Sequence, residues 1–115
     1  GMSGAKLQKE QTRAQNKDTL LEIINNANIS ETQKQEAVNS MISMTDIAEK
    51  ETAAEILLEA KGFEDAIVSI DGDSVDVVVN TAELTEAQRA QIEDIVIRKT
   101  GVSAESIVIS TVNSN

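Results

Sequence analysis

The 115-residue sequence contains no cysteine, proline, histidine, tryptophan or tyrosine, and only one phenylalanine. Without cysteine no disulfide framework can form, and without cysteine and histidine the usual ligands of a structural zinc site are missing. The absence of histidine also removes the side chain that most often carries protons near neutral pH. Because aromatic side chains are almost absent, we expect a core built from aliphatic residues.

These absences leave little basis for catalysis. A serine nucleophile without histidine needs a lysine base, and we expect no such pair here. Acidic residues stand next to each other at Glu64-Asp65 and Glu93-Asp94. Adjacent residues of a helix point about 100° apart, so the second pair is unsuited to sharing one site. We interpret these carboxylates as solvated surface and expect no enzymatic activity, no cofactor and no metal site.

Long apolar runs are also missing, and the charge is unevenly distributed. No segment approaches the roughly 20 apolar residues that cross a bilayer, and the N-terminus is too polar for a signal peptide. The net charge is −10, and it belongs to residues 46–115, because acids and bases cancel in residues 1–45. Such a field repels phosphate backbones, so nucleic-acid binding is not expected. The acidic excess fits either solubility or an acidic docking face.

The chain is predicted to consist of residues 1–30, a polar helical extension or linker, and residues 31–115, a folded domain. Residues 1–18 are polar and fit a frayed helix. Asparagines then interrupt a short apolar patch before Ser30, where the second part begins.

The second part is predicted to open with a long helix. Ser30-Glu31-Thr32-Gln33 fits a capping box. No glycine or proline follows until Gly62, so residues 31–61 form one helix or two with a bend near residues 43–46. Gly62 fits a left-handed helix stop, with Phe63 folding back on the last turn as in a Schellman motif.

Strand patterns follow this helix. Residues 66–71 and 74–80 are rich in β-branched side chains, and valines alternate with polar residues in the second segment. A capping box at Thr85 starts a helix over residues 85–100, which Gly101 should end in the same way as Gly62. Residues 106–112 form the last strand.

The predicted fold is therefore α+β with the order αββαβ. Because a strand–helix–strand unit normally makes a right-handed crossover, the last two strands should be parallel. Helices over residues 46–61 and 85–100 should cover one face of a three-stranded sheet whose edges stay open. The aliphatic side chains that alternate or recur at helical spacing should form the core: Leu57, Leu58, Ala60, Val75, Val77, Val79, Ala87, Ile92, Ile95 and Val96.

Two short motifs allow a second interpretation. Asp71, Asp73 and Asp76 crowd one turn, as in a calcium site, but the spacing lacks the glycine and the glutamate of an EF-hand loop. The Asp71-Gly72 step explains them better as a hairpin turn. Met41 and Met44 fit an adaptable binding surface, although their helical spacing is more typical of a core.

The region of residues 45–112 resembles the extracellular domain of the SpoIIIAH-like family of sporulation proteins. The resemblance lies in the run from Lys61 to Val68, the Asp71-Gly72 turn, the valine strand, and the helix–glycine–strand ending at Gly101. It implies a wedge-shaped ring-building fold that binds a protein partner, stage II sporulation protein Q of the forespore membrane. By the same resemblance the protein would help to form a ring or channel between mother cell and forespore.

The resemblance also implies a location. Members of the family carry one N-terminal transmembrane helix in the mother-cell membrane, and the domain faces the forespore. Gly1 before Met2 is typical of the remnant of a cleaved tag. We therefore expect any membrane anchor to lie in a segment absent from this chain.

The open edge of the last strand is the predicted partner-binding site, because strand addition there supplies main-chain hydrogen bonds. Its residues are Ile107, Val108, Ile109, Ser110, Thr111 and Val112. A proline at Ser110 is predicted to remove an outward amide and abolish binding. The alternative is a ring-forming or adaptor domain of another secretion-type assembly.

Overall fold

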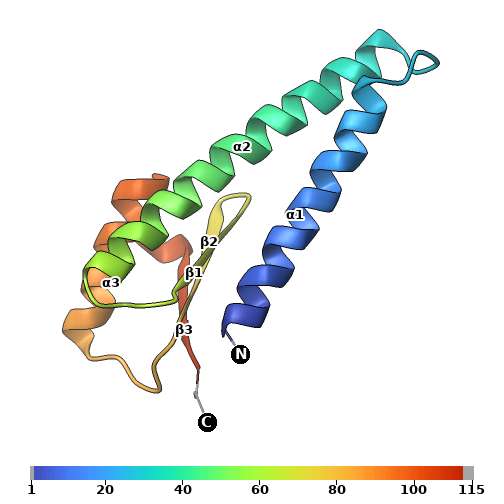
Figure 1. The fold of residues 1–115 in the computed structure, drawn as a ribbon. Coiled ribbons are helices and arrows are strands. Elements are labelled where there is room, and N and C mark those ends of the chain that lie inside the picture. The colour runs from blue at the N-terminus through green and yellow to red at the C-terminus, as the bar shows by residue number, and fades with distance from the viewer. Residues whose placement is uncertain (1, 113–115) are drawn as a thin grey trace.

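The computed structural model describes residues 2–112, so Gly1 and residues 113–115 of the predicted domain lie outside it. Figure 1 shows two long helices side by side, with a small sheet and a third helix at one end. The elements, in chain order, are α1 (Met2–Ile24), α2 (Glu31–Ala60), β1 (Ile67–Asp71), β2 (Ser74–Val79), α3 (Glu86–Thr100), a 3-10 turn (Ala104–Ser106) and β3 (Ile107–Thr111). The predicted αββαβ fold with a preceding helical extension is confirmed, and each strand is one or two residues shorter than predicted. The division into two units at residue 30 stays a prediction.

The long leading helix α2 is continuous, so the alternative with a bend near residues 43–46 is wrong. It begins with the predicted capping box: the Gln33 amide donates to Ser30 Oγ at 3.2 Å, and the Ser30 amide donates to Gln33 Oε1 at 3.4 Å. The same reciprocal pair forms between Thr85 and Gln88 at the start of α3. Each box satisfies amides that the first helical turn leaves without a partner.

The two glycine stops differ from each other. At the end of α2 the Phe63 amide donates to the Leu58 carbonyl and the Gly62 amide to the Glu59 carbonyl, which is the Schellman pattern. At the end of α3 the Gly101 amide donates to the Ile97 carbonyl, the single bond of the αL motif. Both glycines have positive φ, 97° and 79°, as predicted.

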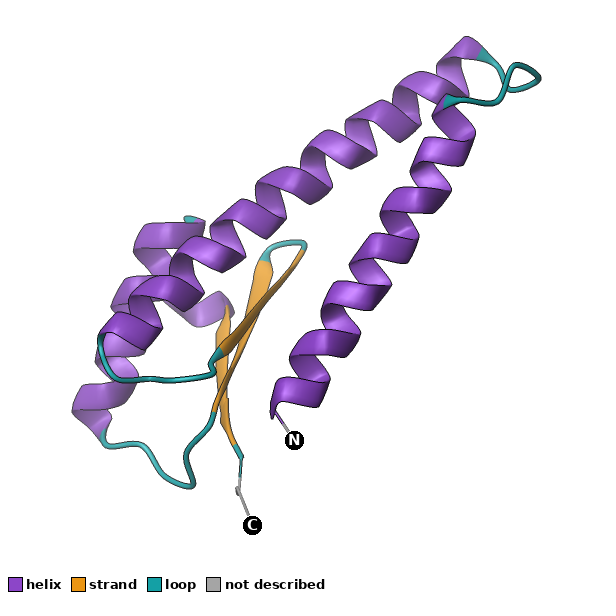
Figure 2. Cartoon of the chain, viewed as in Figure 1, coloured by secondary structure: helices purple, strands orange, loops and turns teal. Residues whose placement is uncertain are grey.

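The strands, orange in Figure 2, form one sheet with the order β1-β2-β3. β1 and β2 form an antiparallel hairpin, in which Asp71 pairs with Ser74 across a two-residue turn. Gly72 in that turn has a φ of 59°, which glycine adopts without strain. β3 returns parallel to β2 after the α3 crossover. The middle strand therefore has two neighbours, and β1 and β3 are the edges.

The core lies between the sheet and the helices α2 and α3. Its fully buried aliphatic side chains are Leu58, Val68, Val75, Val77, Val79, Ile92, Ile95 and Val96. Leu57 and Phe63 are half-buried and pack against this cluster. The predicted core is correct except for Ala60 and Ala87, which are exposed because each lies outside the apolar stripe of its helix.

The helix α1 begins beside the sheet and runs antiparallel to α2 as far as the distant turn, from which α2 returns to the sheet (Figure 1). None of its residues is buried. The molecule is elongated, 55 × 30 × 20 Å, because the two helices reach well beyond the sheet. Among the described residues, no helix is apolar enough over a sufficient length to cross a membrane.

Candidate partner-binding edge of the sheet

The predicted partner-binding residues form the β3 edge, and the direction of each amide follows from the ladder. The amide of Val112, just after the strand, donates to the carbonyls of Val79 and Thr81 at 3.2 and 3.1 Å. Main-chain groups alternate in direction along a strand, so Val108 and Ser110 also bond to β2. The main-chain groups of Ile107, Ile109 and Thr111 consequently point away from the sheet. We define these three residues as the open edge.

This alternation corrects the prediction for Ser110. Its amide points toward β2 rather than outward, so a proline there would break the sheet instead of blocking a partner. The outward amides that suit such a test belong to Ile109 and Thr111. Thr111 is the milder position, because it lies at the end of β3 and its side chain is only half-buried.

The side chains of β3 divide between the two faces of the sheet. Ile107 and Ile109 are half-buried against the core. Val108 and Ser110 lie on the opposite face, where Val108 is 54% exposed. A strand added at this edge would therefore extend both the hydrogen-bonded ladder and the apolar inner face.

The opposite edge of the sheet is closed by side chains. The Val68 amide donates to Glu55 Oε2 at 2.9 Å, and the Ile70 amide donates to Glu51 Oε2 at 2.8 Å. Lys9 Nζ donates to the Val68 carbonyl at 2.6 Å. These are three of the four outward main-chain groups of Val68 and Ile70, so most of this edge is already bonded within the chain.

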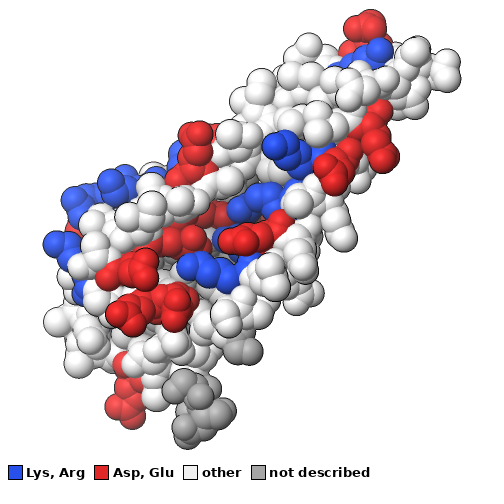
Figure 3. Space-filling view, viewed as in Figure 1, with Lys and Arg blue, Asp and Glu red and all other residues white. Residues whose placement is uncertain are grey.

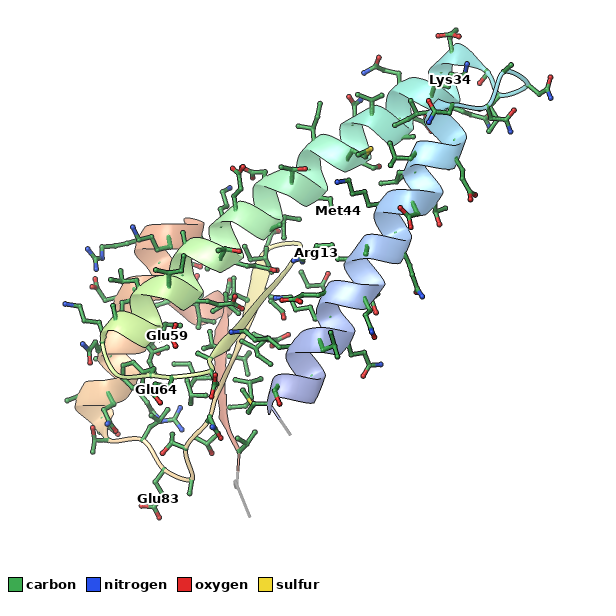
Figure 4. All side chains as sticks on the ribbon, in the orientation of Figure 1. Arg13, Lys34, Met44, Glu59, Glu64 and Glu83 are labelled. Atoms are coloured by element: carbon green, nitrogen blue, oxygen red, sulfur yellow. The ribbon has the colours of Figure 1, made fainter. Side chains whose placement is uncertain are left out.

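Glu51 is the centre of this arrangement. Its side chain is only 3% exposed, and its Oε1 forms an ion pair with Lys9 Nζ at 2.8 Å and accepts a hydrogen bond from the Arg13 guanidinium at 2.9 Å. Figure 4 shows Arg13 reaching from α1 toward α2 and the hairpin. On the face shown in Figure 3, basic and acidic side chains meet along the junction of α1 and α2. The carboxylate thus joins α1, α2 and β1, with both charge and hydrogen bonds compensated.

Sequence reasoning missed this cluster, although a signal was present. Glu51 lies three and seven residues before Ala54 and Leu58, on the buried stripe of α2. A glutamate on such a stripe needs a partner, and Lys9 and Arg13 stand one helical turn apart on α1.

A shallow groove forms a second surface between α1 and α2. It has a volume of about 500 Å³, and Met41, Met44 and Ala48 contribute to its lining. Both methionines are half-buried here and are absent from the main core, so their predicted core position is wrong. Ile56, which also lines the groove, is 63% exposed.

Residues 2–112 show no geometry that supports a metal site or a serine–lysine catalytic pair. No group of three or more acidic side chains is placed to hold a metal ion, and this includes the acids of the hairpin turn. Ser3 and Lys6 do have the Ser-x-x-Lys spacing that we did not expect. Ser3 is exposed on α1, and no hydrogen bond joins its hydroxyl to Lys6.

Comparison with known proteins gives three consistent matches. The sequence model of a family described as SpoIIIAH-like protein matches residues 2–109. Stage III sporulation protein AH of Bacillus subtilis (strain 168) is 24% identical over 94 residues, which cover 82% of this chain and 43% of that protein. The chain thus spans less than half of that curated relative. A chain in the solved structure described as the SpoIIQ-SpoIIIAH pore forming complex has the same fold, with a TM-score of 0.81, 21% identity, and coverage of 97% of this chain and 96% of that one.

Proposed function

Because the chain belongs to the SpoIIIAH-like protein family, we propose that it is the extracytoplasmic interaction domain of a membrane-anchored sporulation protein. In this role it binds SpoIIQ and assembles into a ring or channel between mother cell and forespore. The related fold comes from a complex of SpoIIQ with SpoIIIAH that is described as pore forming, which supports the choice of partner. The domain would lie between the two membranes, with its anchor in the mother-cell membrane outside this chain. The proposal includes no catalytic step.

The open edge of β3 is the observation that supports binding by strand addition. Ile107, Ile109 and Thr111 present main-chain donors and acceptors to the outside, and an extended segment of SpoIIQ can pair with them. Main-chain pairing supplies hydrogen bonds without requiring particular side chains, so it tolerates wide sequence divergence. Val108, exposed beside this edge, adds an apolar contact for a side chain of the incoming strand.

We expect Thr111→Pro to abolish binding to SpoIIQ, because proline removes an outward amide without breaking the bonds between β3 and β2. Thr111→Ala is the matched control, since it removes the same side chain but keeps the amide. Binding is measured by pull-down and by calorimetry with the extracytoplasmic part of SpoIIQ. Circular dichroism verifies that both variants keep their helix content.

Two results would contradict this proposal at different levels. If the unmodified chain forms no complex with SpoIIQ, the partner is wrong. If the complex forms and Thr111→Pro leaves it intact, the edge mechanism is wrong. In that case the groove between α1 and α2 becomes the interface, and Ile56→Glu should weaken binding instead, because it places a charge in its apolar lining.

A further inference from the structure

We propose that α1 and α2 form a guard over the β1 edge, which prevents the open edge of a second copy of this chain from adding to the sheet. The edge guard consists of Lys9, Arg13, Glu51 and Glu55. The inference rests on the geometry of the two sheet edges and does not depend on binding to SpoIIQ.

The guard occupies main-chain groups that a neighbouring strand would use. The amides of Val68 and Ile70 are taken by the carboxylates of Glu55 and Glu51, at 2.9 and 2.8 Å. The Val68 carbonyl is taken by Lys9 at 2.6 Å. An incoming strand must first displace three charged groups from the edge. Natural sheets protect their edges by covering them or by placing charges on them, and here one device does both.

Without the guard, the two edges of the sheet would be complementary. β1 and β3 are both five residues long. Each edge alternates outward main-chain groups with groups already bonded to β2, as in any ladder. Val68 and Ile70 also lie on the same face of the sheet as Ile107 and Ile109, the face that packs toward the core. Pairing β3 of one copy with β1 of the next would continue both the ladder and the apolar layer.

Such pairing would be head-to-tail, so each copy would still have a free edge for the next one. A heterologous contact closes into a ring only if its rotation allows closure, and otherwise it makes filaments. With the β1 edge guarded, only the β3 edge of the sheet can pair with an added strand. Other parts of the surface are then free to determine how copies assemble.

The helix α1 holds the guard in position. Lys9 and Arg13 both pair with Glu51 Oε1, and Oε2 accepts from the Ile70 amide. Lys9 Nζ also lies 3.8 Å from Glu55 Oε2, so one ammonium contacts both guarding carboxylates. Since Glu51 is nearly inaccessible to water, these cations compensate a charge that would otherwise be costly to bury.

The test compares two double variants with the same change in net charge. Glu51→Ala with Glu55→Ala removes both carboxylates from the edge. Glu49→Ala with Glu59→Ala removes two exposed carboxylates from the same helix, whose side chains make no hydrogen bond to β1. Sedimentation velocity over a concentration series measures self-association of each variant and of the unmodified chain.

We expect only the guard variant to gain self-association, with an apparent dissociation constant at least about tenfold below that of the unmodified chain. Adding Thr111→Pro to the guard variant should reverse the gain, because the pairing uses the outward amides of β3. If the guard variant associates no more than the control, or if Thr111→Pro fails to reverse its association, the proposal is wrong.

A second measurement needs no variant, which keeps the proposal testable if the guard variant fails to fold. In the unmodified chain, amide hydrogen exchange should be slow at Val68 and Ile70 and fast at Ile109 and Thr111, although all four point away from the sheet. The difference is expected because only the first two amides are hydrogen-bonded. Equal amide exchange rates at the two edges would contradict the proposal.

Discussion

Single side chains of the aliphatic core carry much of the stability, and Ile95 is the clearest case. It is 1% exposed, between α3 and the sheet. Ile95→Ala should lower the free energy of unfolding by about 2–5 kcal/mol, because the removed atoms leave a cavity in a packed core. Urea denaturation measures the change. Ile42→Ala is the control, since Ile42 is 64% exposed. A loss under about 1 kcal/mol at Ile95 would show that the core relaxes around the missing atoms.

Residue by residue, the apolar core was predictable and the polar contacts were not. The alternation of Val75, Val77 and Val79 identifies the buried face of β2 without any knowledge of its neighbours. Glu51 is different, because its burial depends on cations that lie about 40 residues away along the chain. The amide direction at Ser110 also escaped prediction. The alternation of side chains shows which face of the sheet the Ser110 side chain occupies. The direction of its amide depends instead on which side of β3 the strand β2 lies.

Among the elements, α1 is held differently from the others. It has no buried residue, whereas α2 and α3 contribute side chains to the core. Lys9 bonds to the Val68 carbonyl of the sheet, and Lys9 and Arg13 both pair with Glu51 of α2. Half-buried aliphatic residues near the opposite end, Ile23 and Ile24, lie beside the turn to α2. Local opening that releases the first half of α1 should therefore expose little apolar surface.

We expect amides in the first half of α1 to exchange through an opening that costs less free energy than global unfolding. Amides of α2 near Ala54 and Leu58 should exchange only through global unfolding, because both residues are fully buried. Hydrogen exchange followed by NMR measures both. Lys9→Ala should accelerate exchange in α1 and leave α2 nearly unchanged, with Lys17→Ala as the control on the same helix. Equal protection of the two helices would contradict a separate opening of α1.

The boundaries of most elements followed from local chemistry. Capping boxes begin α2 and α3, glycines end them, and the strands are bounded by the hairpin turn and the 3-10 turn. What local chemistry could not supply was the position of α1. Its apolar residues are too sparse to mark a packing face, so residues 1–18 resembled a linker. The contacts of its first half, made by Lys9 and Arg13, are ionic and depend on the completed fold of α2 and β1.

At the scale of the whole molecule, net charge should influence the rate at which the chain associates with a partner. The net charge of −10 belongs to residues 46–115, which include the sheet. We expect the acidic charge to steer the encounter with SpoIIQ, the proposed partner. The association rate should then fall as salt is added, because the field is screened within about 10 Å at 0.1 M salt and about 3 Å at 1 M. Stopped-flow mixing at several NaCl concentrations measures the rate. The dissociation rate should change less, and an association rate independent of salt would exclude electrostatic steering.

The continuity of α2 also has a mechanical consequence. One end of this helix is fixed in the core by Ala54 and Leu58, and the other reaches the tip of the two-helix arm (Figure 1). Residues 31–50 form a rod of roughly 30 Å at 1.5 Å per residue. A tilt of about 10° at the sheet would move the tip of such a rod by about 5 Å. The arm is therefore a lever, and a small rotation at the sheet is enough to change what the distant turn touches.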